Sequence, residues 1–163
     1  MMIKRFMNIA DRGRFRSTFF ILLPLLIISC IILSSSKSRG ADTGRTSDVQ
    51  LLARAINGEA RGEPYEGQVA VGAVILNRVS SSSFPNTIAG VIYQPGAFTA
   101  VADGQINVPI DSKSSVVKAA QDAINGWDPT HGCLYYWNPA TATSKWIWSR
   151  EIVVKIGKHN FGK

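Results

Sequence analysis

The sequence predicts an α+β domain in which helices come first and a small antiparallel β-sheet lies near the C-terminus. Between residues 48 and 124, apolar residues recur at helical spacing in several segments. After residue 132 the pattern changes to short runs rich in aromatic and β-branched residues, which favour strands. Because the two kinds of pattern occupy separate parts of the chain, the order favours α+β over an alternating α/β fold.

The N-terminal segment has the three parts of an export signal. A basic start is followed by an apolar run from Phe19 to Leu33, and then by a small, polar stretch. The run has about 15 residues, fewer than the roughly 20 that span a bilayer. We expect a signal peptide or an N-terminal membrane anchor over residues 1–36, a linker over 37–47 and the domain over 48–163. Lipidation of Cys30 is less favoured, because apolar residues follow it.

The positive charge of the chain belongs to this leader. Residues 1–47 contain eight Lys/Arg and two Asp, a net charge of +6, whereas residues 48–163 contain ten Lys/Arg and nine Asp/Glu, a net charge of +1. A nearly neutral domain has no basic stripe that follows phosphates, which excludes nucleic-acid binding. We expect an extracytoplasmic monomer that touches a membrane only through its N-terminal segment.

The helical half of the domain begins with two helices separated by a glycine- and proline-marked turn. Ser47 is a good N-cap for the first helix, and Gly58 and Gly62 close it. Pro64 is expected in the first turn of the second helix. The surface of this second helix is mostly apolar, which predicts the buried central helix of the domain.

The remaining elements are shorter and follow in order. Glycine, proline and serine residues mark their ends. We expect a turn over 80–83, a short helix over 87–93, an irregular segment over 98–107, a helix from Ser112 or Ser114 to Ile124, and strands over 133–137, 145–148 and 152–156.

Glu59 is the most informative single residue, because it lies where the first helix gives way to the turn. A carboxylate there faces the negative end of the helix dipole, and desolvation would also favour its protonated form. A protonated carboxyl group is what a general acid for glycosidic cleavage needs. By contrast, Glu63 and Glu66 are expected to be solvated surface charges, with a cap of the second helix as the alternative for Glu63.

Aromatic side chains are the candidate sugar-binding groups, since a flat ring can stack on a pyranose. Most of them are expected in the core. Trp137 and Trp146 are favoured as outward-facing platforms, because polar residues between them supply hydrogen-bonding groups. The candidate substrate-binding residues are Tyr93, Phe98, Asp103, Trp137 and Trp146.

A cysteine amidase or peptidase is an alternative, because Cys133 and His159 supply a thiol and an imidazole. However, Cys133 begins a strand and so lacks the helix N-terminus that lowers the pKa of reactive thiols. A small buried thiol is therefore the expected role. The chain has two histidines and no HExxH motif, too few ligands for a zinc site, so we expect neither a metal nor a cofactor.

Long strings of the domain match a known pattern. Residues 51–79 contain Asn-Gly-Glu-Ala-Arg-Gly-Glu-Pro, and further matching strings cover 84–93, 96–106, 138–150 and 156–161. From Asp48 to Phe161 the chain resembles the catalytic domain of the spore cortex-lytic enzymes, the germination-type cell wall hydrolases of spore-forming bacteria. The resemblance implies a lysozyme-like fold with a lytic-transglycosylase-like helical lobe, and Glu59 as the catalytic acid.

The activity that the resemblance implies is lytic transglycosylation of peptidoglycan. The bond between N-acetylmuramic acid and N-acetylglucosamine breaks, and the muramic 6-hydroxyl closes an anhydro ring. The family's usual substrate is spore cortex peptidoglycan, marked by muramic δ-lactam. Many such enzymes carry a peptidoglycan-binding repeat domain before the catalytic domain, and residues 34–47 are too short for one. A vegetative or sporulation role in wall remodelling therefore stays open.

Two further alternatives remain at this point. A true hydrolase would use a second carboxylate, for which Asp103, Asp111 and Glu151 are candidates. A non-catalytic wall-binding module would bind peptidoglycan without cleaving it. Sequence alone does not place any second carboxylate opposite Glu59.

Overall fold

A computed structural model describes residues 44–163. The expected signal peptide, Cys30 and most of the expected linker lie outside these residues. The described chain is helical over residues 44–60, here called the Glu59 helix. It continues with α2 (Tyr65–Ser80), α3 (Ile88–Ile92), α4 (Thr99–Ala102), η2 (Gln105–Asn107), α5 (Ser115–Ile124), β1 (Tyr135–Trp137), η3 (Lys145–Ser149), β2 (Ile152–Ile156) and β3 (His159–Gly162). Within residues 44–163, no helix is long and apolar enough to cross a membrane.

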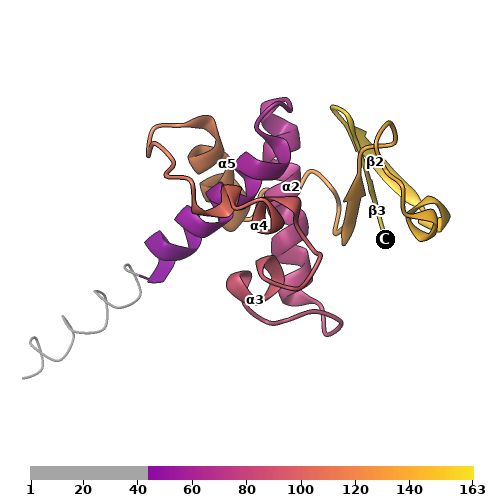
Figure 1. Ribbon diagram of the computed structural model, residues 1–163, viewed down its shortest axis with the longest axis horizontal. Helices are drawn as coiled ribbons and strands as arrows, with labels where there is room; N and C mark the ends of the chain where they lie inside the picture. The colour runs from indigo at the N-terminus through magenta and orange to yellow at the C-terminus, as the bar shows by residue number, and fades with distance from the viewer. Residues whose placement is uncertain (1–43) are drawn as a thin grey trace, which may run out of the picture. The chain divides into compact units, whose positions relative to one another are not determined.

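Helix α2 is the centre of the fold, as its apolar surface predicted. Its residues from Gly67 to Ile75 are all buried. It contacts α5 and α3 as well as the strands β1 and β2. Figure 1 shows the other helices gathered around α2 on one side, with the sheet on its other side. The α+β order is therefore confirmed: a helical lobe comes first and a small antiparallel sheet follows.

The Glu59 helix begins earlier than predicted. Residues 44–47 are helical, although the sequence assigned them to the linker with Ser47 as the N-cap. A tertiary contact accounts for part of the difference, because Arg45 donates a hydrogen bond of 2.6 Å to the side chain of Asn125 beyond α5. At the other end, Gly58 does not close the helix but lies inside it.

The later helices follow the predicted boundaries closely. Pro64 is the N-cap of α2, one residue before the expected first turn. Thr87 caps α3 by accepting a hydrogen bond from the Gly90 amide. Ser114 precedes α5, and Gly126 beyond its end has a φ of 103°. The segment 98–107, expected to be irregular, instead forms α4 and η2.

The sheet differs from the prediction in one of its three strands. Residues 145–149 form the 3₁₀ turn η3 and not the predicted strand. Such a turn produces the same alternation as a strand, since it buries Ile147 and exposes the two tryptophans beside it. The third strand is β3, which pairs antiparallel with both β1 and β2 and lies between them. Gly157, with a φ of 58°, allows the two-residue turn between β2 and β3.

Candidate active site

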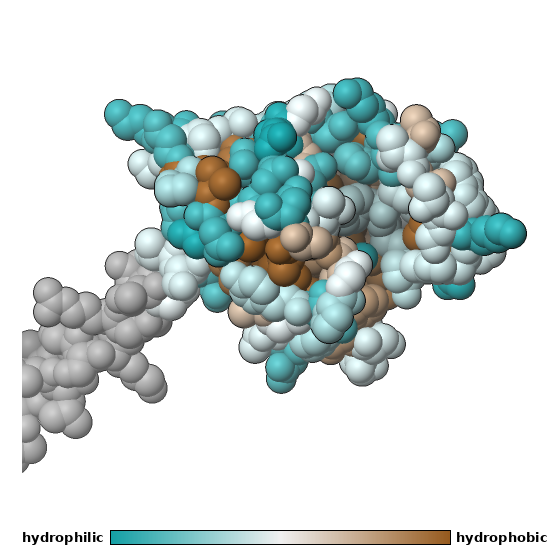
Figure 2. All heavy atoms as spheres, in the orientation of Figure 1, coloured by the Kyte–Doolittle hydropathy of each residue, from teal (hydrophilic) through white to brown (hydrophobic). Residues whose placement is uncertain are grey.

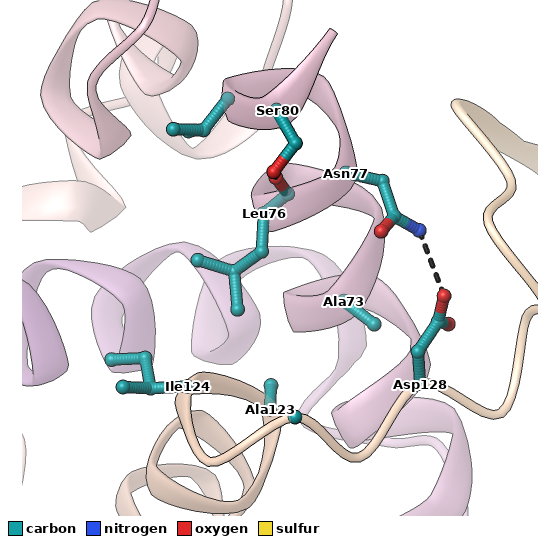
Figure 3. A pocket seen from close by; sticks show the side chains of 9 residues that line it. Ala73, Leu76, Asn77, Ser80, Ala123, Ile124 and Asp128 are labelled. Carbon is teal, nitrogen blue, oxygen red and sulfur yellow. Dashed lines mark hydrogen bonds between the residues drawn. The ribbon is translucent and has the colours of Figure 1, made fainter.

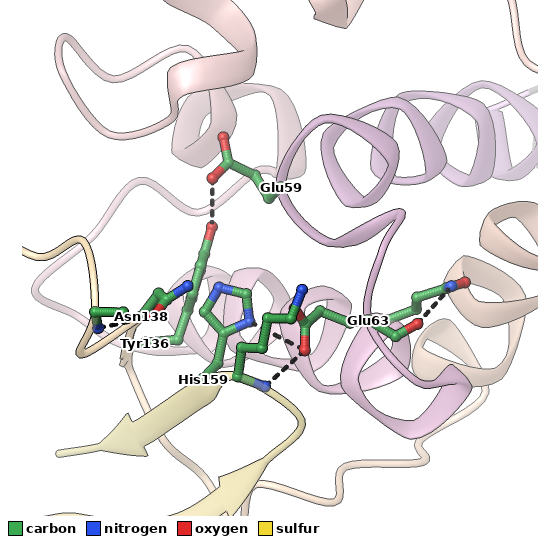
Figure 4. A network of polar contacts seen from close by, with 8 residues as sticks. Glu59, Glu63, Tyr136, Asn138 and His159 are labelled. Carbon is green, nitrogen blue, oxygen red and sulfur yellow. Dashed lines mark hydrogen bonds and ion pairs between the residues drawn. The ribbon is translucent and has the colours of Figure 1, made fainter.

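Glu59 lies at the penultimate position of its helix and is half-buried. Its Oε1 accepts a hydrogen bond of 3.0 Å from the backbone amide of Ala100 in α4. Its Oε2 accepts a hydrogen bond of 3.2 Å from the hydroxyl of Tyr136 in β1 (Figure 4). The carboxylate is therefore oriented by two donors that come from the helical lobe and from the sheet.

Gly58 permits the first of these contacts. A Cβ atom at position 58 would collide with the side chain of Ala100 and would lie 3.3 Å from its Cα. Only a residue without a side chain lets α4 approach the Glu59 helix this closely. Gly58, which was predicted to end the helix, thus makes room for the Ala100 amide that donates to Glu59.

Tyr136 is held in its protonated form. Burial raises the pKa of Tyr136 well above its usual value, and the neighbouring Glu59 carboxylate raises it further, against the opposing effect of Arg78. A phenol can donate to a carboxylate and can also accept from a carboxyl proton. Tyr136 is therefore suited to support Glu59 in either of its protonation states.

Glu63 is not a surface charge, which corrects the prediction. Its side chain is 6% exposed, and its Oε2 accepts a hydrogen bond of 2.8 Å from the Lys158 amide in the turn between β2 and β3. The same carboxylate lies 3.8 Å from Nδ1 of His159. These contacts of Glu63, here called the Glu63 clamp, tie the sheet to the turn that follows Glu59. Glu66 is exposed, as predicted.

His159 lies between Glu63 and Tyr136 (Figure 4). Its ring meets the ring of Tyr136 edge-on, with centroids 5.4 Å apart and an interplanar angle of 88°. Burial lowers the pKa of His159, which outweighs the opposite effects of Glu63 and Glu59. A neutral imidazole therefore packs behind the tyrosine that supports Glu59.

The predicted substrate-binding residues divide by exposure. Tyr93 and Trp146 are 50% and 51% exposed, so each presents a ring surface. Phe98 and Trp137 are 3% and 6% exposed, and the expectation that Trp137 points outward is wrong. Trp137 packs instead into the sheet, where its ring would lie 3.2 Å from a Cβ at Gly162. Asp103 is exposed and accepts two hydrogen bonds from Gln105, so it shapes its own turn.

The candidate second carboxylates are not brought to Glu59 by any hydrogen bond among residues 44–163. Asp111 accepts a bond of 2.8 Å from the Lys113 amide within a local turn. Glu151 is exposed at the start of β2. Within the described chain, no three His, Cys, Asp or Glu side chains are grouped as a metal site needs.

Cys133 is a buried structural thiol, which argues against the cysteine-enzyme alternative. The residue is 0% exposed, and its Sγ donates a hydrogen bond of 3.0 Å to the carbonyl oxygen of Thr130. Burial raises the pKa of the Cys133 thiol, the reverse of what a nucleophilic thiolate needs.

Two cavities of similar size open on the domain. One of about 290 Å³ lies between α2 and α5 and is largely apolar, apart from groups such as Asn77 and Asp128, which are joined by a hydrogen bond of 3.0 Å (Figure 3). The other, of about 270 Å³, is lined by Arg78, Tyr135 and Trp146, together with the loop after α3. On the face seen in Figure 2, apolar residues surface only in patches among hydrophilic ones.

Sequence reasoning missed Tyr136, Ala100 and Arg78. Tyr136 belongs to a run of three aromatic residues, and nothing in that run distinguishes it as the one that reaches Glu59. Ala100 contributes only its amide, which every residue except proline carries. The single available signal was Gly58, because a glycine beside a candidate acid can mark a close approach of another backbone.

These features define a small α+β domain with one supported carboxylate between its helical lobe and its sheet. The chain belongs to the Cell Wall Hydrolase family, whose model matches residues 62–162. That match begins after Glu59, so support for a role of Glu59 comes from its hydrogen bonds to Ala100 and Tyr136.

Individual relatives agree with this assignment. The spore cortex-lytic enzyme of Bacillus cereus is 65% identical over 117 residues, which cover 72% of this chain and 44% of that protein. The chain thus spans less than half the length of this curated relative. The catalytic domain of the Bacillus cereus SleB protein matches with a TM-score of 0.68 and 64% identity, over 72% of this chain and 91% of that one.

A second solved structure gives the same result. The catalytic domain of the germination-specific lytic transglycosylase SleB from Bacillus anthracis matches with a TM-score of 0.68 and 65% identity, over 71% of this chain and 93% of that one. At such identity the likeness extends beyond topology, and the expected helical lobe with a small C-terminal sheet is confirmed.

Proposed function

We propose that this chain is a lytic transglycosylase that cleaves the bond between N-acetylmuramic acid and N-acetylglucosamine in peptidoglycan, with Glu59 as its acid and base. The observation that carries the proposal is the Glu59 carboxylate, which is half-buried and oriented by the Ala100 amide and the Tyr136 hydroxyl. The Bacillus anthracis relative, described as a lytic transglycosylase, supports the same reaction.

The reaction uses one carboxyl group twice. Protonated Glu59 gives its proton to the glycosidic oxygen as the bond to the muramic C1 breaks, so that the leaving sugar departs as an alcohol. The Glu59 carboxylate then takes the proton of the muramic 6-hydroxyl while that oxygen bonds to C1. The anhydro ring closes, no water is consumed, and Glu59 returns to its protonated form.

The use of a single carboxylate favours transglycosylation over hydrolysis. Hydrolysis by the usual route needs a second carboxylate to activate water or to attack the sugar. Among residues 44–163, the carboxylate nearest to Glu59 in the sequence, that of Glu63, accepts a hydrogen bond from the Lys158 amide and is 6% exposed. Tyr136 is the partner of Glu59 instead, and it positions the acid without competing for the proton.

The relatives support the proposed substrate and location. The Bacillus cereus relative is named a spore cortex-lytic enzyme, which supports cortex peptidoglycan as the substrate and a site of action outside the cytoplasm. We expect the domain to work as a monomer, and we expect residues 1–36 to direct export or to anchor it. The exposed rings of Tyr93 and Trp146 are the proposed contacts with sugar rings.

Muropeptide analysis by mass spectrometry tests the proposal. Digestion of cortex peptidoglycan should release products that end in anhydro-muramic acid, whereas reducing ends would establish hydrolysis instead. Glu59→Gln should lower the rate by roughly 100- to 10,000-fold, the usual contribution of a general acid. The amide oxygen of Gln still accepts from Ala100, so circular dichroism should show an intact fold. Wild-type activity in this variant would exclude Glu59 as the acid.

A further inference from the structure

The groove of about 270 Å³ lies on the molecule where the loop after α3 meets the aromatic residues of β1 and η3. The loop contributes Gln94 and Ala97, and the aromatic residues are Tyr135 and Trp146. Arg78 of α2 also lines it. The groove therefore combines apolar ring surface with polar donors, which is the composition of a small-ligand site and not of a purely apolar contact.

Trp146 presents a fixed ring that is accessible in part, because the guanidinium carbon of Arg150 lies over it, 5.4 Å from the ring centre. It is 51% exposed, and it packs edge-on against Tyr135 with centroids 5.3 Å apart and an interplanar angle of 80°. Trp148, two residues further along η3, is 52% exposed but does not line the groove. The two tryptophans thus have similar exposure and opposite relations to the groove.

Arg78 brings unused donors to the same place. Its Nε donates a hydrogen bond of 2.7 Å to the Leu134 carbonyl oxygen. Its guanidinium carbon lies 5.3 Å from the ring centre of Phe84 and 5.5 Å from that of Phe98, which hold the group in position. Among the described residues, the Nη atoms of Arg78 bond to no protein acceptor. A guanidinium stays charged and carries five donors, so its free ones suit an oxygen of a ligand.

The groove lies close to Glu59, because Arg78, which lines it, interacts electrostatically with Glu59 and Tyr136. Ala97 lines the groove, and Ala100, which donates its amide to Glu59, is three residues away. That separation spans at most about 11 Å of chain. One glycan strand can therefore reach both places.

We propose that this groove is a subsite for one N-acylated amino sugar of the glycan strand, with its ring face on Trp146 and its acyl carbonyl oxygen on Arg78. The inference rests on the proposed function, because it requires a glycan at Glu59. Both sugars of peptidoglycan carry an acyl nitrogen, and the muramic δ-lactam retains a carbonyl oxygen. The subsite accepts cortex and vegetative strands alike, since Arg78 reads the carbonyl group that they share.

Equilibrium binding to an inactive protein tests the subsite. The probe is soluble glycan strands freed of stem peptides, and the host is the Glu59→Gln variant, which leaves the strands uncut. Adding Trp146→Ala should weaken binding roughly tenfold, the loss expected for a central aromatic contact. Adding Trp148→Ala, the matched control, should change the affinity less than twofold. Thermal unfolding of all three proteins checks that the fold is kept.

A second comparison tests the role of Arg78. Arg78→Lys keeps the charge but loses the planar fork, and it should weaken binding of N-acetylated strands several-fold. Chemically de-N-acetylated strands lack the acyl oxygen. The Glu59→Gln protein and the same protein with Arg78→Lys should therefore bind these strands with equal affinity. A difference that survives de-N-acetylation would overturn the assignment of the carbonyl group.

The outcomes separate the subsite from the proposed function. If the Trp146→Ala and Trp148→Ala proteins bind the strands equally well, the subsite is overturned. Release of anhydro products by the wild type would still support the proposed function. Failure of the Glu59→Gln protein to bind strands, together with no release of anhydro products by the wild type, overturns both. Weakening by Trp146→Ala alone supports the subsite.

Discussion

The hydroxyl of Tyr136 lies 3.2 Å from Oε2 of Glu59, although the two residues are 77 positions apart. The acid comes from the end of a helix in the first part of the domain, and its support comes from the first strand of the sheet. The site therefore exists only when the helical lobe and the sheet are packed together. The Glu63 clamp makes a second connection between the same two parts.

Replacing Tyr136 with Phe should lower the turnover number and leave KM nearly unchanged. The substitution removes the donor to Glu59 but keeps the ring against His159. An acid that is no longer fixed in orientation loses roughly 10- to 100-fold in rate. Release of muropeptides over a range of substrate concentrations measures the effect.

Tyr65→Phe is the matched control for this prediction. It removes a phenol-to-carboxylate hydrogen bond of 2.6 Å, to Asp122, that has no part in supporting Glu59. We expect a loss of about 1.5–3 kcal/mol in the free energy of unfolding and unchanged turnover. Equal losses of turnover in the two variants would contradict a role of Tyr136 in orienting the acid.

Gly58→Ala should lower activity sharply although alanine favours helices. The new methyl group collides with Ala100, which must move and weaken its amide bond to Glu59. Gly62→Ala is the control, because a Cβ at Gly62 meets nothing within 4 Å. That variant should keep full activity. Activity assays beside thermal unfolding of both proteins make the comparison, and a fully active Gly58→Ala enzyme would show that the close approach is unnecessary.

Glu63→Ala should destabilise the domain by about 1–3 kcal/mol, because it leaves the Lys158 amide without its acceptor at a side chain that is 6% exposed. Glu66→Ala, on an exposed position of α2, should stay within about 0.5 kcal/mol of the wild type. Urea unfolding measures both. If the two substitutions cost the same, the Glu63 clamp does not hold the sheet.

The stability of the domain should depend on His159 at mildly acidic pH. Burial lowers the pKa of this histidine in the folded protein below the ordinary value of 6.5. The unfolded chain therefore takes up the proton first as the pH falls, and stability decreases from about pH 6.5 down through the folded-state pKa. His159→Gln should flatten this part of the curve of unfolding free energy against pH. An unchanged slope would show that other groups cause it.

Most of the helical lobe could be predicted from the sequence, because local patterns determine it. The apolar surface of α2, the cap at Thr87 and the glycine after α5 all identify their elements without knowledge of the rest of the fold. The position of Glu59 at a helix end follows from the same patterns. Its two donors do not, since Ala100 and Tyr136 come from elements far away in the sequence.

The sheet was harder to predict because packing overrides its local patterns. Trp146 and Trp148 alternate with Ile147 as in a strand, yet one 3₁₀ turn meets the same pattern of burial. The strand β3 contains His159, Asn160 and Gly162, which are poor strand formers, and all four of its residues are buried between two neighbours. Glu63 was misjudged for the same reason, since only the folded hairpin covers it.

The central place of β3 has a consequence for synthesis. Tyr136 gains its backbone partner, Phe161, only after the ribosome has added the last of the three strands. A nascent chain that stops short of Phe161 lacks the strand that joins β1 to β2, and its acid has no tyrosine in place. The support of Glu59 is therefore complete only when the last strand of the sheet has been made.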